Sequence, residues 1–132
     1  MTDRAQKSDV AELLALAREF VEGFNSGDVD RIMRFYADRY VDVNLEQPVQ
    51  TKAERAEYYR KIIARGDTKV DVRPEEVIAA GEYAFVRGTI LLFRATEGDR
   101  RAAPTKLRYL EVARTYSDGW RAIWGLDAPI HS

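Results

Sequence analysis

The sequence predicts an α+β fold in which three N-terminal helices pack on one face of a curved, mainly antiparallel sheet. In the first half of the chain, apolar residues recur every three or four positions in three segments, as on one face of a helix. From Lys69 onward they recur at every second position, which is typical of strands. This separation of helices from strands favours helices gathered on one side of an antiparallel sheet.

The first two helices are expected to meet at a short turn. The first begins after Asp9, whose side chain can cap it with Glu12 three residues later. It ends at Gly27, because glycine readily adopts the left-handed conformation that follows a helix. Asp28 then offers the N-cap of a short second helix, whose apolar stripe runs to Tyr36.

One strand and a third helix follow. Residues 40–46 alternate in polarity, which predicts a strand. Thr51 and Glu54 have the spacing of a capping box, and this pair predicts a third helix that ends at Gly66.

The second half of the chain is expected to form an antiparallel meander with strands at 70–79, 83–95, 105–116 and 120–127. Pro74 predicts a bend or bulge in the first of them, because proline cannot donate to a ladder. Gly119 closes the sequence Ser117-Asp118-Gly119, which predicts a tight hairpin between the last two strands.

Length and charge narrow the classes of function. We expect the 132 residues to form a single domain with its core at about 9–127. Lys and Arg number 21 against 22 Asp and Glu, and a net charge of −1 argues against nucleic acid, which needs a concentrated basic surface. No apolar stretch approaches the ~20 residues that span a bilayer, and the polar N-terminus lacks a signal-peptide core. The sequence therefore predicts a cytoplasmic protein with no membrane partner.

Metal and cofactor sites are not expected. The chain has no cysteine, and its one histidine is the penultimate residue His131, so the usual ligands of zinc and iron are missing. There is no glycine-rich phosphate loop. The serines lie at termini, caps or turns, which argues against a Ser-His-acid triad.

Pairing the predicted strands sorts their residues onto two faces. We expect Tyr116 opposite Arg121 and Phe93 opposite Leu107, registers in which a one-residue slip would exchange the faces. One face then carries Arg87, Thr89, Leu91, Tyr109, Glu111, Ala113 and Trp124. The other carries Val86, Ile90, Leu92, Leu110, Val112 and Ile123.

Both faces hold apolar residues, although the helices can cover only one of them. The second face would expose a large apolar patch on a monomer, so the sequence predicts a homodimer through this outer face of the sheet. The alternative is that the long stems of arginines at its edge shield the patch without a partner.

Two segments carry a family resemblance. Residues 20–40, FVEGFNSGDVDRIMRFYADRY, join two helices through N-x-G-D and continue to Y-A-D. Residues 111–125 place D-G-W between two strands. Both segments resemble the nuclear transport factor 2-like superfamily and its ketosteroid isomerase-like and SnoaL-like domains, and the resemblance covers about 9–127. It implies that the helices and sheet form a cone with an internal pocket.

The same resemblance implies roles for particular residues. In ketosteroid isomerases a tyrosine and a protonated aspartate bind the substrate oxygen, and a second aspartate moves the proton. These positions fall on Phe20, Glu111 and Asn44 respectively. Phe20 has no hydroxyl and Asn44 is no base, so steroid isomerase activity by that mechanism is not expected. Asp42 is the nearest carboxyl that can replace Asn44 as a base.

Glu111 is the main catalytic candidate. Its strand neighbours on the same face are apolar or aromatic, and such surroundings raise the pKa of a carboxyl unless a cation compensates. Arg87 lies diagonal to it in the predicted register and can be that cation. Glu111 is then either a general acid or substrate anchor, or half of a buried Arg87–Glu111 pair that fixes the cavity wall.

The remaining candidates belong to the pocket walls. Asp42 and Asn44 alternate with apolar residues, so they face either the pocket or water, and the sequence leaves both orientations open. Trp124 is expected to floor the pocket on the same face as Trp120. A tryptophan floor suits a flat or apolar small ligand. The expected ligand contacts are Phe20, Tyr40, Asn44, Tyr59, Arg87, Tyr109 and Trp124.

Two kinds of function fit these residues. One is an isomerase or lyase without metal or cofactor, which moves protons on a small cyclic or carbonyl substrate with Glu111 and Asp42 as acid and base. The other is a non-catalytic ligand-binding or dimerisation module, in which arginines hold the carboxyls or the carboxyls point outward. The fold implied by the resemblance hosts both kinds.

Overall fold

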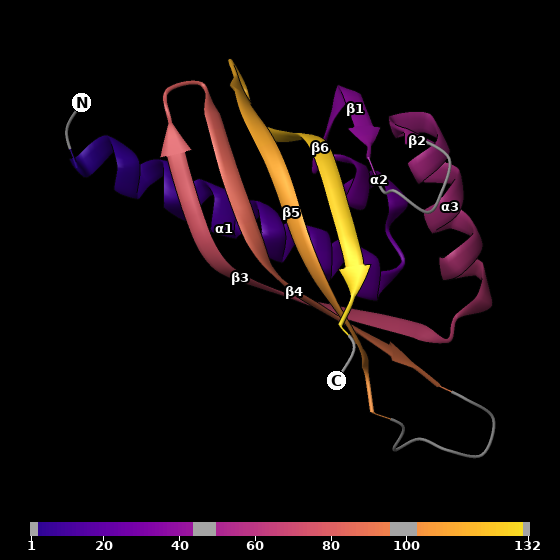
Figure 1. The fold of residues 1–132 in the computed structure, drawn as a ribbon. Coiled ribbons are helices and arrows are strands. Elements are labelled where there is room, and N and C mark those ends of the chain that lie inside the picture. Colours follow the sequence, from indigo (N-terminus) through magenta and orange to yellow (C-terminus); the bar gives the residue numbers. More distant parts are fainter. Residues whose placement is uncertain (1–2, 44–49, 96–102, 131–132) are drawn as a thin grey trace.

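The computed structural model describes residues 3–43, 50–95 and 103–130. Helices α1 (Asp3–Ser26), α2 (Val29–Met33) and α3 (Lys52–Arg65) lie on one side of a twisted sheet (Figure 1). The described strands are β1 (Tyr36–Asp42), β2 (Gln50–Thr51), β3 (Thr68–Ala80), β4 (Tyr83–Arg94), β5 (Thr105–Tyr116) and β6 (Gly119–Pro129). The predicted α+β architecture is confirmed.

Strands β3 to β6 form the predicted antiparallel meander, and β1 joins it at the far edge. Within the described residues the sheet has the order β2-β1-β6-β5-β4-β3. Strand β1 runs parallel to β6, with Asp42 opposite Gly125, and β2 pairs antiparallel with β1. This parallel pairing is what brings the carboxyl of Asp42 next to the meander.

Two helix boundaries differ from the prediction. Helix α1 starts at Asp3, so Asp9 lies inside the helix, where its carboxylate accepts a hydrogen bond from Trp120 Nε1 at 3.2 Å. Helix α2 ends at Met33, and Tyr36 already belongs to β1. The carbonyl of Phe35 accepts from the amide of Ala122, so pairing with β6 takes over where the helix had been expected to continue.

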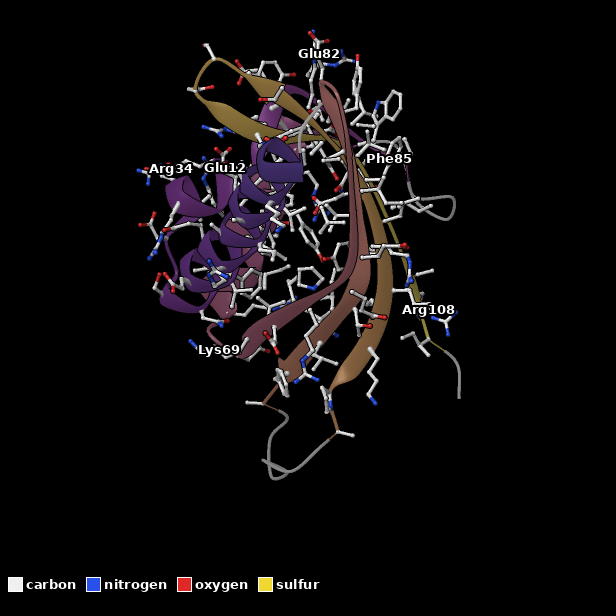
Figure 2. The ribbon with its side chains drawn as sticks, turned by 90° about the vertical axis from the view of Figure 1, so that its left-hand side faces the viewer. Glu12, Arg34, Lys69, Glu82, Phe85 and Arg108 are labelled. Carbon is white, nitrogen blue, oxygen red and sulfur yellow. The ribbon has the colours of Figure 1, made fainter. Side chains whose placement is uncertain are left out.

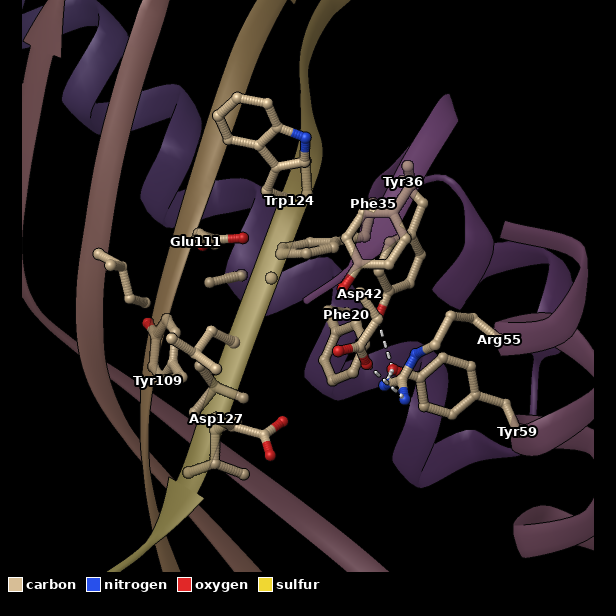
Figure 3. A pocket seen from close by; sticks show the side chains of 18 residues that line it. Phe20, Phe35, Tyr36, Asp42, Arg55, Tyr59, Tyr109, Glu111, Trp124 and Asp127 are labelled. Atoms are coloured by element: carbon tan, nitrogen blue, oxygen red, sulfur yellow. Dashed lines mark hydrogen bonds and ion pairs between the residues drawn. The ribbon is translucent and has the colours of Figure 1, made fainter. Parts of the chain in front are cut away.

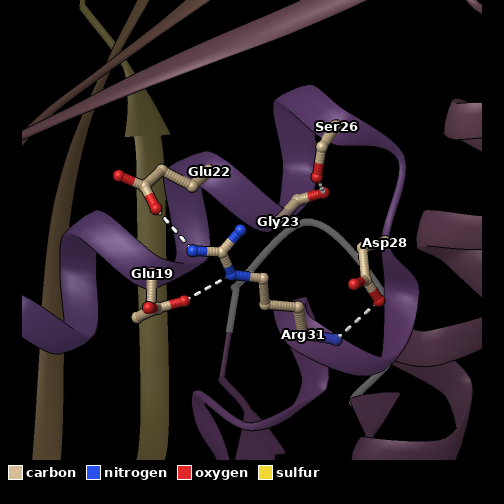
Figure 4. Close-up of polar contacts among 6 residues, drawn as sticks. All are labelled: Glu19, Glu22, Gly23, Ser26, Asp28 and Arg31. Atoms are coloured by element: carbon tan, nitrogen blue, oxygen red, sulfur yellow. Dashed lines mark hydrogen bonds and ion pairs between the residues drawn. The ribbon is translucent and has the colours of Figure 1, made fainter.

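The junction of α1 and α2 is held by a small polar network (Figure 4). The side chain of Asp28 caps α2 by accepting from the amide of Arg31 at 3.1 Å. The guanidinium of Arg31 in turn pairs with Glu19 and Glu22 of α1. Gly27 has a φ of 76° between the helices, as its predicted role at the end of α1 requires.

The core lies between the helices and the inner face of the sheet. One cluster of buried residues joins α1, α2 and α3 to the strands and comprises Phe24, Ile32, Tyr36, Tyr40, Tyr59, Val70 and Ala122. A second cluster lies under the N-terminal half of α1 and comprises Leu13, Ala84, Val86, Ala113 and Trp120. The predicted capping box of Thr51 and Glu54 starts α3, and Gly66 ends it.

The predicted register between β4 and β5 is wrong by three residues. Leu107 pairs with Ile90 rather than Phe93, and Glu111 pairs with Val86. Since three is odd, the faces of β4 are exchanged: Val86 points toward the helices and Arg87 points away. The reason is that a long connection between two strands, unlike a tight turn, does not fix their register.

A β-bulge in β6 overturns a second expectation. The pairs Ala113–Ala122 and Val112–Trp124 leave Ile123 as an extra residue, so the faces of β6 change at this point. Trp120 is buried on the inner face, whereas Trp124 pairs with the outward-facing Val112. The two tryptophans therefore lie on opposite faces, although their spacing of four predicted the same face.

Among the described residues, no helix combines the length and the apolar character that crossing a membrane requires.

The predicted bulge at Pro74 is confirmed, and it leads to a test of the sheet's curvature. The β3–β4 register shifts between Pro74 and Glu76, and Gly88 lies opposite. A Cβ at Gly88 would collide with the carbonyl of Arg73 and lie 2.9 Å from Pro74 Cα. We expect Gly88→Ala to lower the free energy of unfolding by about 1–3 kcal/mol, because backbone atoms must shift. Urea denaturation measures this change, and Thr89→Ala should cost much less. Equal stability of the two variants would contradict it.

Candidate functional site

A pocket opens between the inner face of the sheet and helices α1 and α3 (Figure 3). Its cavity volume is about 80 Å³, below the usual range for sites of small ligands, and the surrounding empty space with the open mouth is about 600 Å³. Most of its wall is aromatic or aliphatic, and the polar groups are few. The lining residues used below are Phe20, Tyr36, Tyr40, Asp42, Arg55, Tyr59, Tyr109, Glu111, Trp124, Gly125 and Asp127.

The two carboxyls expected to act as acid and base both line this pocket. Glu111 and Asp42 are each paired with Gly125, from opposite sides of β6, so the three residues form one row across β5, β6 and β1. Neighbouring strands are about 4.8 Å apart, which puts the two backbones roughly 10 Å apart with the glycine between them. The orientation of Asp42, which the sequence left open, is toward the pocket.

Glu111 is a buried acid in apolar surroundings. It is only 9% exposed, and no hydrogen bond or ion pair joins its carboxyl to another side chain in the described part of the chain. Burial raises the pKa of Glu111 to about 8. At neutral pH this carboxyl is therefore mainly protonated, so it can donate a hydrogen bond or a proton to a ligand.

A polar cluster faces Glu111 across the pocket (Figure 3). Arg55 of α3 lies 3.6 Å from Asp42 and donates to the hydroxyl of Tyr59 at 2.6 Å. Tyr59 also bonds Tyr36, hydroxyl to hydroxyl. Burial raises the pKa of both tyrosines, so their hydroxyls stay protonated. The cluster fixes a carboxylate, a guanidinium and two phenols at one end of an otherwise apolar cavity.

Most of the residues predicted to contact a ligand come together here. The same pocket is lined by Phe20 from α1, Tyr40 from β1, Tyr59 from α3 and Tyr109 from β5. Asn44 lies outside the described residues.

Arg87 is a correction. It is 56% exposed on the opposite face of the sheet, where it donates to Glu76 at 2.7 Å, and so it does not pair with Glu111. Arg87 points away from Glu111 because the β4–β5 register differs by three residues from the predicted one.

Trp124 is a second correction. It lines the edge of the pocket but is 46% exposed, because the bulge turns its side chain outward, and so it does not form the floor.

Arg55 and Asp127 were not predicted from the sequence. Arg55 stands four residues before Tyr59 on α3, and this helical spacing was the available signal. Asp127 lies near the end of β6, and burial raises its pKa. In the sequence alone, the neighbours of Asp127 do not distinguish it from a surface aspartate. In the described ranges, no three His, Cys, Asp or Glu side chains are grouped as metal ligands.

Comparison with known proteins gives one family match. A family model described as a SnoaL-like domain matches residues 17–123. A comparison with curated proteins found no match.

Several solved structures share the fold. An NTF2-like protein with a cystatin-like fold from Novosphingobium aromaticivorans has a TM-score of 0.83 at 19% identity, over 97% of this chain and 86% of that one. A ketosteroid isomerase-like protein from Erwinia carotovora atroseptica has a TM-score of 0.71 at 21% identity, over 94% of this chain and 98% of that one. A candidate dehydratase of the NTF2-like family from Streptomyces avermitilis has a TM-score of 0.76 at 18% identity, over 96% of this chain and 99% of that one. Identities this low show the fold alone.

The buried acid makes stability depend on pH in a defined way. The pKa of Glu111 is about 8 in the folded state and about 4.5 in the unfolded chain. Its contribution is therefore complete below pH 4.5, is lost as the pH rises toward 8, and is constant above 8. Glu111→Gln has no such loss. We expect its free energy of unfolding, relative to the unsubstituted protein, to rise by up to ~1.4 kcal/mol per pH unit in this window.

Urea denaturation at several pH values between 4 and 9 measures this difference. Glu12→Gln, at an exposed position on α1, is the matched control and should give a difference that does not change with pH. A flat difference for Glu111→Gln as well would show that Glu111 titrates like an exposed carboxyl.

Proposed function

Because the chain belongs to the SnoaL-like domain family, we propose that its pocket binds a small apolar cyclic or carbonyl compound and moves a proton on it. The observation that carries this proposal is Glu111, a buried acid with a raised pKa and no partner among the described side chains, in the wall of an aromatic pocket. Buried acids of this kind are more common at catalytic sites than elsewhere.

The two carboxyls suit complementary roles. Asp42 lies in an ion pair with Arg55 and supplies a carboxylate base, while Glu111 supplies an acid. Asp42 takes a proton from the carbon next to a carbonyl group, and Glu111 gives its proton to the carbonyl oxygen, which yields a neutral enol. Return of a proton to a different carbon completes an isomerisation. Loss of a β-hydroxyl group, protonated to leave as water, completes a dehydration.

Enolisation can be followed directly by exchange of the α-proton of cyclic ketones in D₂O, measured by ¹H NMR. We expect Glu111→Gln to lower the exchange rate about 100-fold or more, because a general acid contributes that much. Asp42→Asn should have a similar effect. The rate should also fall above pH 8, where Glu111 loses its proton.

Exposed Glu12→Gln is again the control and should keep the full rate. Ligand affinity, measured by calorimetry, should survive in Glu111→Gln. Binding without exchange or dehydration of any ketone or β-hydroxy ketone would overturn the catalytic proposal and leave a ligand-binding module.

We also propose that the outer face of the sheet pairs two copies of the chain. Figure 2 shows Phe85 and Arg108 on the side of the sheet away from the helices. Phe85 is 44% exposed and lies in one row with Ile78, Val112 and Trp124, across β3 to β6. Such a continuous apolar row favours a partner over solvent.

A charged residue in the middle of this row should separate the two copies. We expect the unsubstituted protein to sediment at twice its mass of 15.1 kDa and Phe85→Glu to sediment as a monomer. Tyr58→Glu is the control, since it changes an exposed aromatic residue on α3 instead. If the unsubstituted protein sediments as a monomer at micromolar concentration, the proposed dimer is wrong.

A further inference from the structure

The row of Asp42, Gly125 and Glu111 has a gap at its centre. Side chains directly opposite each other on adjacent strands have Cβ atoms about 5 Å apart, so a side chain at position 125 would contact both carboxylic side chains. Glycine places no side chain of β6 in that volume on the inner face. Asp42 and Glu111 therefore flank a gap whose floor is the backbone of β6.

The hydroxyl of Tyr40 reaches into this gap. A Cβ built on Gly125 would overlap Tyr40 Oη and lie 3.3 Å from its Cζ. Tyr40 stands two residues before Asp42 on β1, so both side chains point to the same face. The ring packs against Tyr36 with centroids 4.4 Å apart, and this contact fixes its direction.

Tyr40 differs from the other phenols of the pocket in having its hydrogen-bonding capacity available. Its hydroxyl bonds no other group in the described part of the chain, although the residue is only 5% exposed. Tyr36 and Tyr59 bond each other, and the hydroxyl of Tyr109, which likewise has no hydrogen-bond partner, is fully covered. Burial raises the pKa of Tyr40, with Asp42 and Glu111 adding to the rise, so the hydroxyl keeps its proton between the two carboxyls.

We infer that the hydroxyl of Tyr40, which lies over Gly125, donates a hydrogen bond to the oxygen of a carbonyl ligand bound in the pocket between Asp42 and Glu111. This inference rests on the proposed function for the class of ligand. It adds a second donor beside Glu111, supplied from β1 at the opposite side of the gap. Donors already in place for a developing oxyanion are among the strongest contributions to enolisation. Gly125 is a positioning residue, because any side chain there would displace the hydroxyl of Tyr40.

A pair of matched ligands isolates this hydrogen bond. The bicyclic ketone 1-indanone and the hydrocarbon indane have nearly the same shape, and only the ketone has an acceptor oxygen. We expect the unsubstituted protein to bind 1-indanone about tenfold more tightly than indane, since a buried donor without its acceptor loses about that much. Tyr40→Phe should have a clearly smaller preference for the ketone, because only Glu111 remains as a donor, and its affinity for indane should be unchanged. Calorimetry or NMR titration measures both affinities.

Tyr58→Phe, on the exposed side of α3, is the matched control and should keep the preference for the ketone. Gly125→Ala should weaken both ligands more than tenfold while circular dichroism shows the fold retained. The inference is overturned if Tyr40→Phe keeps the full preference, or if the unsubstituted protein has none. These readouts need no turnover. A protein that shows the Tyr40-dependent preference but exchanges no α-proton would refute the proposed catalysis and leave this inference standing.

Discussion

The extra residue of the β-bulge in β6 is the constraint on which the pocket depends. If the register of Ala113 and Ala122 continued without the bulge, Glu111 would lie opposite Trp124. The indole ring would then fill the space beside the acid. With Ile123 inserted, Gly125 takes that place and Trp124 turns outward. One residue thus opens the gap between the two carboxyls and also adds an aromatic ring to the outer face.

The chemistry of the pocket follows from how differently its two sides are solvated. Glu111 lies on a strand wall with aliphatic and aromatic neighbours, and burial holds it in the neutral form at physiological pH. Asp42 lies across the gap beside the guanidinium of Arg55, which also fixes the phenol of Tyr59. In the proposed reaction, Glu111 as the acid and Asp42 as the base can act in one small cavity, because only Asp42 has a cation beside it.

The two faces of the sheet carry different kinds of residues. Its inner face carries the row of carboxyls and the two buried clusters, while its outer face carries the row centred on Phe85. Ion pairs such as Arg87–Glu76 lie on the outer face and leave the pocket without their charge. An arginine beside Glu111 would stabilise the ionised carboxylate, and Glu111 would then have no proton to donate at neutral pH. Because Arg87 points away from the pocket, burial acts unopposed on the Glu111 carboxyl and raises its pKa.

The sequence by itself determined which segments are helices and strands, since periodicity, the capping box at Thr51 and the bulge at Pro74 are local properties. It also indicated Glu111 and Asp42 as candidates, from a family resemblance and from polar residues within apolar strands, but it left the orientation of Asp42 open. Only the tertiary structure decided the registers of β4 and β6 and the neighbours of β1, which depend on packing between segments far apart in the chain. For that reason Arg87 and Trp124 were misplaced, and Arg55 and the role of Gly125 were not foreseen. A glycine between two carboxyls has a meaning only once the strands beside it are known.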